Sequence, residues 1–264
     1  MWVTMDLARR LEACDANHAA EYVRARLLSD PQFPGDICRI AGGMAIRSGP
    51  DSPINFAVGI GLGVGVSVAD VQAIEEFFLT AATPPLFKLS PWADRELWSL
   101  LKSQGYGVSD FLNVWVLPLK DWVPDDCADG DVVIHEVGDD AAEVWADTVS
   151  TGFDGRMPTA RDRAFLRGFY DSVSTTAFLA TWGGSPAAAG TVSTHEGVGM
   201  LFNTSTIDGY RSRGLQMRLI HQRLAHAQRR GCDLAMVQAT PGSASERNIA
   251  RAGFQLAYTK LFVQ

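Results

Sequence analysis

The residues best suited to chemistry form one short stretch, from Tyr210 to Met217, with the sequence YRSRGLQM. A β-prone segment ends just before it, and apolar residues at helical spacing follow it as far as Arg230. The first turn of a helix has main-chain N–H groups without intrahelical partners and carries about half a positive charge, so it attracts anions. Gly214 has no Cβ, which lets a ligand come close to those amides. The spacing therefore predicts a phosphate-type anion site between a strand and a helix.

The charge of this region is opposite to that of the whole chain. Between Gly209 and Cys232 there are six arginines, two histidines and no acidic residue, whereas the formal net charge of the protein is −7. Four of these arginines are expected to form a solvated helix face from which any of them can contact phosphates: Arg218, Arg223, Arg229 and Arg230. A helix entry with solvated arginines and no ligand is the simpler alternative. The reversal of sign indicates a polyanionic ligand.

Length and composition indicate a globular protein of two domains. The 264 residues, of which 47% are apolar and 20% charged, suit two domains of about 100–150 residues each. The acidic balance argues against nucleic acid and anionic membranes as general partners. The cysteines have no metal-ligand spacing, so we expect reduced thiols, no metal and a cytoplasmic location. No signal peptide is expected, and proline, asparagine and glycines in the uncharged stretch from Ser52 to Ala69 argue against a membrane span.

Periodicity and turn signals predict an α/β chain in which helices alternate with short strands. In the first half, the predicted helices are 6–28, 67–82 and 94–104, and the predicted strands are 38–46, 54–60, 86–89 and 111–119. In the second half, the predicted helices are 139–150, 161–170, 215–230 and 243–252, and the predicted strands are 132–137, 176–182, 187–195, 198–206, 234–239 and 254–262. Five aspartates in 121–131 leave that segment little to bury. The predicted organisation is a domain 1–120, a linker 121–131 and a domain 132–264.

The two halves share an ending. The segment from Leu86 to Pro91 is followed by a predicted helix, Gly105-Tyr106 and a strand, and the segment from Met236 to Pro241 is followed by a predicted helix, Gly253-Phe254 and a strand. This pattern predicts an internal repeat. Only the second copy has the basic glycine turn.

The spacing Arg211-x-x-Gly214-x-Gln216 resembles the Q/R-x-x-G-x-G/A acetyl-coenzyme A signature of the GNAT (Gcn5-related) N-acetyltransferases. The resemblance extends over the second half, whose element order is that of the family, and Gly253-Phe254 takes the place of the closing Gly-Phe. The first half looks like a second, degenerate copy, as in tandem GNAT proteins. The resemblance implies an α/β (α+β) fold of two GNAT-like domains, each with a mixed, largely antiparallel sheet flanked by helices. It also implies splayed central strands in the C-terminal domain.

The same resemblance implies acetyl-CoA as cosubstrate and direct attack on its thioester by a primary amine of a small molecule or peptide. The pantetheine would pair with strand backbone, the acetyl carbonyl would face a main-chain N–H near Thr204, and the pyrophosphate would lie on the amides of the glycine turn. Asn248 is assigned either to the coenzyme or to the loop before it. The coenzyme-binding residues implied are Ser205, Thr206, Ile207, Arg211, Ser212, Arg213, Gly214, Leu215, Gln216, Met217 and Asn248.

Two residues depart from the family pattern. Gln216 stands where glycine or alanine is usual, so the turn must accommodate a side chain or use it as a donor. The tyrosine that often protonates the leaving thiolate falls at Ile249, which has no proton to give. The replacements considered are Tyr258 on the last strand, Ser245 in the short helix, or water. The candidate bases for the amine are Asp154, His195 and Glu196.

The sequence is compatible with two functions. The first is an N-acetyltransferase with catalysis in the second half. The second is a non-catalytic acyl-CoA-binding sensor or scaffold, which Ile249 and the degenerate first half favour. An unrelated α/β nucleotide-binding protein is a more distant alternative.

Overall fold

The computed structural model describes residues 2–124 and 131–264, which form two compact units. Unit 1 contains the chain up to Trp115, together with Ala239–Ser243 and Leu256–Gln264. Unit 2 contains Val116–Gln238 and Ala244–Gln255. No helix in these described ranges is both long enough and apolar enough to cross a membrane.

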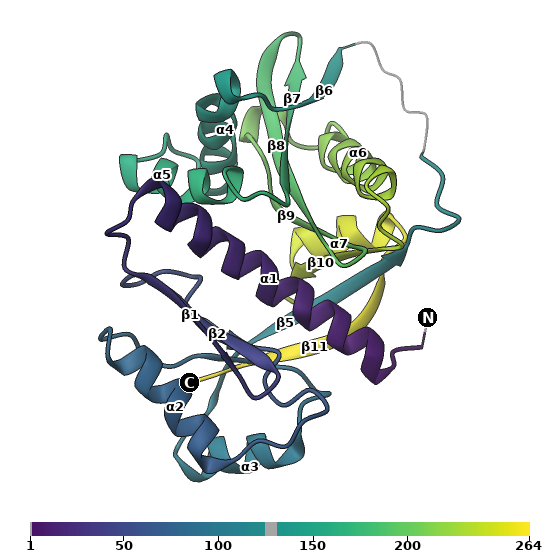
Figure 1. The fold of residues 1–264 in the computed structure, drawn as a ribbon. Coiled ribbons are helices and arrows are strands. Elements are labelled where there is room, and N and C mark those ends of the chain that lie inside the picture. Colours follow the sequence, from purple (N-terminus) through teal and green to yellow (C-terminus); the bar gives the residue numbers. More distant parts are fainter. Residues whose placement is uncertain (1, 125–130) are drawn as a thin grey trace. The chain divides into compact units, whose positions relative to one another are not determined.

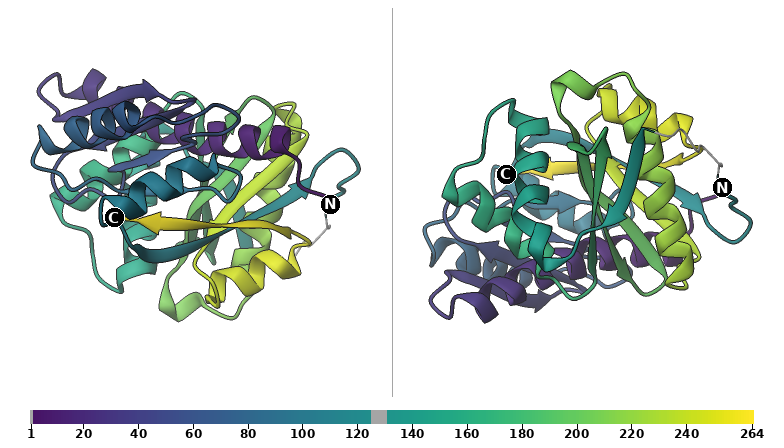
Figure 2. Two further views of the ribbon diagram at one scale, coloured as in Figure 1. Left: turned by 90° about the horizontal axis from the view of Figure 1, so that it is seen from below. Right: turned by 90° about the horizontal axis from the view of Figure 1, so that it is seen from above.

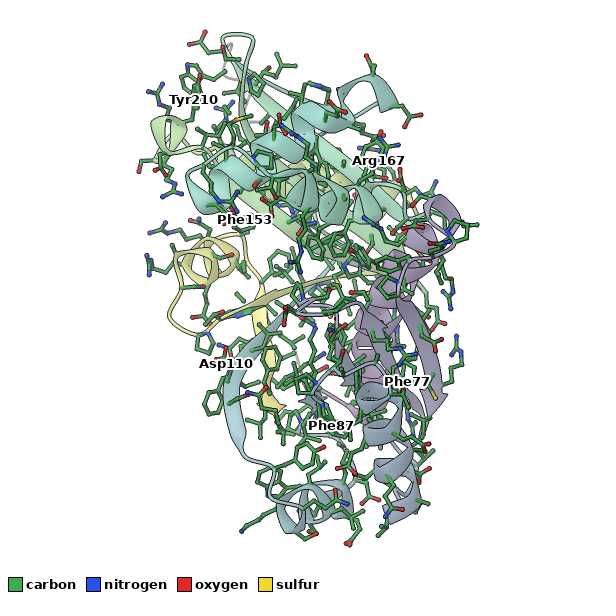
Figure 3. All side chains as sticks on the ribbon, turned by 90° about the vertical axis from the view of Figure 1, so that its left-hand side faces the viewer. Phe77, Phe87, Asp110, Phe153, Arg167 and Tyr210 are labelled. Atoms are coloured by element: carbon green, nitrogen blue, oxygen red, sulfur yellow. The ribbon has the colours of Figure 1, made fainter. Side chains whose placement is uncertain are left out.

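Unit 1 is built on a mixed sheet with the strand order β1-β2-β3-β4-β11-β5 (Figure 1). Its strands are β1 (Gly35–Ile40), β2 (Gly43–Ser48), β3 (Phe56–Val58), β4 (Phe87–Leu89), β5 (Val108–Pro118) and β11 (Gln255–Val263), and its helices are α1 (Met5–Ser29), α2 (Val68–Leu79) and α3 (Arg95–Ser103). Strands β3 and β4 run parallel, whereas β1–β2, β2–β3 and β4–β11 are antiparallel. Helices α2 and α3 bury their apolar residues against this sheet, around Phe78 and Phe87. Figure 3 labels Phe87 and its neighbour Phe77 in this core.

The single strand predicted over 38–46 is wrong. The chain reverses there at Ala41 and Gly42, whose φ angles are +44° and +80°, and β1 pairs antiparallel with β2 on the two sides of this turn. Two consecutive residues with positive φ make the tight turn that a β-hairpin needs. Alanine rarely adopts that conformation, so of the two turn residues only the glycine indicated a turn in the sequence.

Unit 2 has a sheet in the order β10-β9-β8-β7-β6, covered on both faces. Its strands are β6 (Val132–Glu136), β7 (Thr175–Trp182), β8 (Ser185–His195), β9 (Val198–Thr206) and β10 (Leu234–Ala239). Its helices are α4 (Ala142–Asp154), α5 (Ala160–Tyr170), α6 (Leu215–Arg229) and α7 (Ala244–Arg251), with short 3-10 helices η1 (Asp139–Ala141) and η2 (Asp208–Tyr210). Helices α4 and α5 lie on one face and α6 on the other (Figure 1). Strands β9 and β10 run parallel, and the other pairs whose register is known are antiparallel.

The last strand of the chain belongs to unit 1. Strand β11 pairs with β4 through Leu261 opposite Leu89, and it lies beside β5 (Figure 2). The final residues of β5 belong instead to unit 2, where the Leu119 N–H donates to the Asp233 carbonyl at 2.9 Å. The last strand of the second half therefore completes the sheet of unit 1, while only the end of β5 reaches unit 2. The predicted linker 121–131 stays a prediction, because 125–130 lie outside the described residues.

A buried ionic cluster holds β11 against α1 in unit 1. Lys260 lies 2.7 Å from the Asp15 carboxylate and 3.0 Å from that of Glu12, and all three residues are at most 1% exposed. Tyr258 donates to Glu12 at 2.7 Å, and Lys88 lies 3.6 Å from Asp15. Burial by itself lowers the pKa of Lys260, but the two carboxylates reverse that effect and raise it. The cluster thus ties β11 to α1, because Lys260, the one charged residue of this strand, has two carboxylate partners on that helix.

We predict that Lys260→Met destabilises the protein by about 3–5 kcal/mol, because it removes the cation that pairs with both buried carboxylates and leaves only Lys88, 3.6 Å from Asp15, beside them. The free energy of unfolding in urea measures this. Since the folded pKa of Lys260 is raised, the difference from wild type should persist below its ordinary value of 10.5 and shrink as the pH rises through the folded value. Lys102→Met, at an exposed position of α3, is the control and should change stability by less than about 0.5 kcal/mol. An equal effect of both variants would contradict the role of the cluster.

Candidate functional site

Strand β9 has a partner along its whole length on one side but only along its first half on the other. It pairs with β10 from Val198 to Leu201, where Leu201 faces Val237. On the opposite side it pairs with β8 as far as Thr206. Its edge from Phe202 to Thr206 is therefore open toward the gap beyond β10. An open strand edge presents backbone donors and acceptors to an extended ligand.

A β-bulge lies at the start of this open edge. Thr191 of β8 faces Phe202, but Ala189 faces Ser205, so Gly190 lies opposite two residues, Asn203 and Thr204. Asn203 has a φ of +47°, a left-handed conformation that asparagine tolerates better than most residues. A bulge leaves one residue of the strand out of the ladder and turns its polar groups away from it. The expected main-chain donor near Thr204 thus falls at a position where the ladder is interrupted.

The basic glycine turn follows the end of β9 directly. After η2 the chain passes Ser212 (φ +60°) and Gly214 (φ +77°), and α6 begins at Leu215. Gly214 is the N-cap of α6, and no side chain caps the helix there. A Cβ at Gly214 would meet no atom within 4 Å, so the space in front of the turn is open. The first amides of α6 are consequently left to solvent or to a ligand.

A groove of about 510 Å³ extends from this turn along α6. Arg213, Gly214, Met217 and His221 line its helix side, and Val132 and Ile134 of β6 line the other. The groove therefore combines a cationic end at the turn with an apolar wall. Helix α6 has no acidic residue in its first turn, which keeps this end positive.

The two arginines of the turn have different surroundings. Arg211 donates to the Thr206 carbonyl at 3.3 Å and to the Gly152 carbonyl at 3.0 Å, and it pairs with Asp208 at 2.8 Å. It therefore fastens the end of β9 to the end of α4. The Arg213 guanidinium lies 4.8 Å from the Trp182 ring centroid and 5.8 Å from that of Tyr210. Figure 3 labels Tyr210 at this turn.

Arg223 is the functional candidate that sequence reasoning missed. The expectation of a solvated helix face is wrong for this residue, since it is 1% exposed. Its guanidinium points into the sheet at the bulge and donates to the carbonyls of Thr191 and Phe202. Burial lowers its pKa to about 9, so it stays protonated at neutral pH. The one available signal was its position, since Leu219, Arg223 and Ala227 share the face that α6 buries.

The three predicted strand-end residues lie together but differ in their contacts. Ser205 is buried, and its hydroxyl donates to the Val149 carbonyl at 2.9 Å. The Ile207 N–H donates to the Ala187 carbonyl at 3.0 Å. Within the described part of the chain, the buried Thr206 hydroxyl and the Asn203 side-chain amide nitrogen have no hydrogen-bond partner. Both polar atoms are therefore buried without a partner in this structure, which is uncommon in folded proteins.

The remaining predicted residues divide between the two units. Ser245 and Asn248 lie on α7 in unit 2, Ser245 exposed and Asn248 half-buried, with Arg251 donating to Asn248 at 3.5 Å. Ile249, at the position of the family's tyrosine, is 3% exposed. Tyr258 lies in unit 1, where burial raises the pKa of its hydroxyl and Glu12 accepts its hydrogen bond. The structure therefore does not bring Tyr258 and the glycine turn into one unit.

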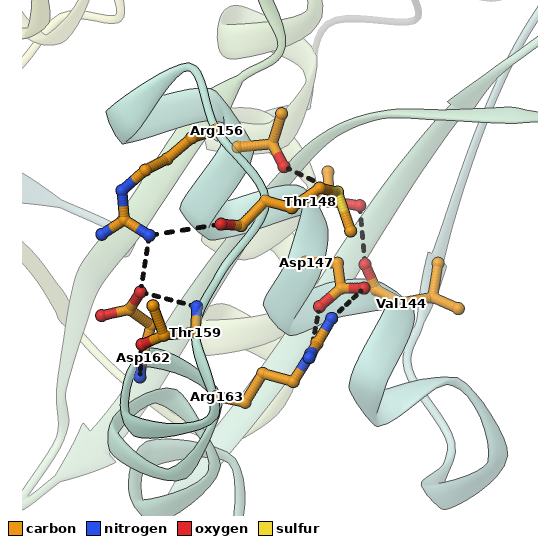
Figure 4. A network of polar contacts seen from close by, with 9 residues as sticks. Val144, Asp147, Thr148, Arg156, Thr159, Asp162 and Arg163 are labelled. Atoms are coloured by element: carbon orange, nitrogen blue, oxygen red, sulfur yellow. Dashed lines mark hydrogen bonds and ion pairs between the residues drawn. The ribbon is translucent and has the colours of Figure 1, made fainter.

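A polar network joins α4 to α5 on the face opposite α6 (Figure 4). Arg163 donates to both carboxylate oxygens of Asp147, at 2.7 and 3.1 Å. Asp162 accepts from the Thr159 N–H and from Arg156, each at 2.9 Å, and thereby completes the capping box that begins α5. These contacts fix the segment between the two helices.

The candidate bases do not gather at the bulge. His195 and Glu196 lie at the turn between β8 and β9, five residues or about 16 Å along the strand from Gly190. The Ser174 hydroxyl lies 3.1 Å from the His195 ring. Asp154 ends α4 and pairs with Arg156 at 3.4 Å.

Comparisons with known proteins find matches among solved structures. No protein-family model matches the chain, and no curated protein matches it. A GCN5-related N-acetyltransferase from Kribbella flavida aligns over 97% of this chain and 95% of its own, with a TM-score of 0.65 and 17% identity. A GCN5-related N-acetyltransferase from Sphaerobacter thermophilus aligns over 97% of this chain and 90% of its own, with a TM-score of 0.59 and 16% identity. A tandem GNAT protein from the clavulanic acid biosynthesis pathway aligns over 94% of each chain, with a TM-score of 0.59 and 14% identity.

This chain has the tandem GNAT fold. The three structures cover nearly its whole length, and its mixed, helix-flanked sheets match theirs, so the expected fold class is confirmed. At 17% identity or less, the likeness concerns the fold alone. The bulge, the open edge of β9 and the glycine turn all lie in the second GNAT-like unit.

We predict that Asp162→Asn destabilises this second unit in a pH-dependent way. The Thr159 backbone N–H, with Arg156, lowers the pKa of Asp162 below its ordinary value of 3.8. The stability that the carboxylate contributes is therefore present above that value and lost as the pH falls through the folded pKa. Urea unfolding at pH 7 and in strong acid measures this, with the exposed Asp121→Asn as control. A difference from wild type that stays constant across that acid range would contradict the prediction.

Proposed function

We propose that this protein is an acetyl-CoA-dependent N-acetyltransferase whose coenzyme binds in unit 2. One observation carries the proposal: an open edge of β9 leads directly into a helix start without a side-chain cap. Together they offer backbone partners for an extended amide chain and, at its end, amides for a diphosphate. The tandem GNAT fold supports the same assignment.

The residues of the turn suit the diphosphate of coenzyme A. The backbone amides from Ser212 to Met217 would hold it, with Gly214 allowing close approach. Arg213 supplies positive charge at the mouth of the groove, whereas Arg211 acts by fixing the end of β9. Gln216 is half-buried on the first turn of α6 and fits there as an additional donor. All of these residues belong to the coenzyme-binding set predicted from the sequence.

The shielded polar groups of β9 suit the pantetheine arm. Strand alternation turns the backbone of Thr206 toward the open edge, where its carbonyl accepts from Arg211. The Thr206 hydroxyl and the Asn203 amide lack other partners in the described residues. Acetyl-CoA, when bound, supplies an activated thioester carbonyl. The main-chain N–H at the bulge would donate to the carbonyl oxygen and stabilise the negative charge that develops there during amine attack.

Protonation of the leaving thiolate is assigned to Ser245 or to water held by it. Ser245 is exposed on α7 of the same unit. Tyr258 is a weaker candidate, since its proton is shared with Glu12 in unit 1 and burial raises its pKa. Asn248, one turn along α7, is assigned to the coenzyme. The acceptor is a primary amine of a small molecule or peptide.

A non-catalytic acyl-CoA-binding module is the second candidate function. The observation that favours it is the buried, apolar Ile249 where the family pattern has a proton donor. Incubation with acetyl-CoA and a broad panel of primary amines, followed by assay of free thiol, separates the two. The enzyme releases thiol above the hydrolysis background with at least one amine. The module binds acetyl-CoA in calorimetry and releases none.

We predict that Gly214→Asp weakens binding of coenzyme A by about tenfold or more, because it sets a carboxylate against the diphosphate. Isothermal titration calorimetry with coenzyme A measures the effect. The matched control is Gly231→Asp at the other end of α6, where glycine has a similar φ of +81° and a Cβ would also meet no atom within 4 Å. The control carries the same backbone strain and should bind as wild type does. Unchanged affinity in Gly214→Asp would show that the diphosphate lies elsewhere.

A further inference from the structure

Arg223 is a buried cation held by neutral acceptors. Within the described residues no carboxylate lies within ion-pair distance of it, and desolvation is the one cause of its lowered pKa. Its Nε donates to the Leu219 carbonyl at 2.9 Å, and its Nη1 donates to the Thr191 carbonyl at 3.1 Å. Nη1 also contacts the Phe202 carbonyl at 3.4 Å and the Thr204 hydroxyl. Burying a charge without a counter-charge is costly, so the guanidinium must be held by these hydrogen bonds.

All three strand contacts of Arg223 converge on the bulge. Phe202 and Thr204 flank Asn203 on β9, and Thr191 lies across from them on β8. Gly190 provides the space, because a Cβ there would lie 3.0 Å from the guanidinium. The guanidinium thus fills the position of the missing side chain and ties together both strands at the one place where their ladder is interrupted.

A long apolar side chain would occupy the same volume without the cost of a buried charge. What such a side chain could not do is hold the Phe202 carbonyl and the Thr204 hydroxyl in fixed directions. Fixing the groups on both sides of Asn203 fixes the peptide planes between them. The direction of the main-chain N–H at the bulge follows from those planes.

We propose that Arg223 is a positioning residue that sets the bulge of β9, so that its main-chain N–H faces the acyl carbonyl of bound acetyl-CoA. This inference rests on the proposed function. Arg223 makes no contact with the diphosphate turn, and its contacts with β9 are confined to the bulge, at the Phe202 carbonyl and the Thr204 hydroxyl. Its loss should therefore impair polarisation of the thioester and the turnover number, while affinity for coenzyme A is retained.

Infrared difference spectroscopy of bound acetyl-CoA tests this directly, because a hydrogen bond lowers the stretching frequency of the thioester carbonyl. Wild type should lower that frequency relative to free acetyl-CoA. In Arg223→Met the frequency should return toward the free value, and turnover should fall by about tenfold or more. Affinity for coenzyme A in calorimetry should stay within about twofold. Arg24→Met, at an exposed position of α1 in unit 1, is the control and should match wild type in all three measurements.

Two further variants retain Arg223 in the sequence but disturb its contacts, and they guard against misfolding of Arg223→Met. Gly190→Ala pushes the guanidinium aside, and Thr204→Val removes one of its acceptors. Each should return the carbonyl frequency part of the way toward the free value. Arg223→Lys keeps the charge but not the fork of donors, and should lie between wild type and Arg223→Met.

The outcomes separate this inference from the proposed function. If wild type binds no acetyl-CoA, both the proposed function and this inference are wrong. If wild type lowers the carbonyl frequency and Arg223→Met, Gly190→Ala and Thr204→Val keep that lowering, the inference alone is overturned. A parallel loss of coenzyme A affinity in these variants would also overturn it, because it would show a general structural role.

Discussion

The pairing between β9 and β10 ends after four residues, while β9 continues to Thr206 along β8. Unpaired backbone groups inside a protein are costly, so a strand that loses one neighbour needs replacement partners or a ligand. The side facing β8 is held by an antiparallel ladder that is interrupted once, at the bulge. On the side facing the gap, β9 has no neighbouring strand beyond Leu201. The bulge, the glycine turn and the start of α6 all lie beyond the point in the chain where this pairing stops.

The two units differ in the partners of their buried positive charges. In unit 1, Lys260 meets the carboxylates of Glu12 and Asp15, so the cluster is closed and locks β11 onto α1. In unit 2, Arg223 meets carbonyls and a hydroxyl, and its charge is not cancelled by a carboxylate among the described residues. The first arrangement specifies a fold. The second leaves a positive charge beside the strand edge where the account places a thioester.

Much of the fold was accessible from the sequence. The glycine turn, the helix after it and the strand before it were predicted at nearly the observed bounds, because apolar periodicity and a glycine N-cap are local signals. The tandem arrangement followed from the shared ending of the halves. The hairpin turn at Ala41 was not predicted, since alanine rarely adopts a positive φ angle. The pairing of β11 with β4 in unit 1 was not predicted either, because it depends on contacts between residues far apart in the sequence.

The parts of the site that depend on local conformation were predicted, and those that depend on contacts far apart in the sequence were not. Backbone groups of the turn depend on local conformation, so residues from Ser212 to Met217 could be placed by pattern. The surroundings of Arg223 and Tyr258 depend on tertiary burial, which the sequence shows only as a helix face or an alternating strand. A buried arginine and an exposed one at neighbouring turns of α6 look alike in sequence. Their difference is the presence of the bulge beneath one of them.

The most direct test of the account is hydrogen–deuterium exchange of the full chain with and without saturating coenzyme A. The account predicts slower exchange of the amides from Ser212 to Met217 and of the open edge of β9 from Phe202 to Thr206. Strands β1 to β3 of unit 1 should exchange as before. Protection confined to unit 1, or an unchanged glycine turn under saturating ligand, would contradict the claim that unit 2 binds the coenzyme at the end of β9.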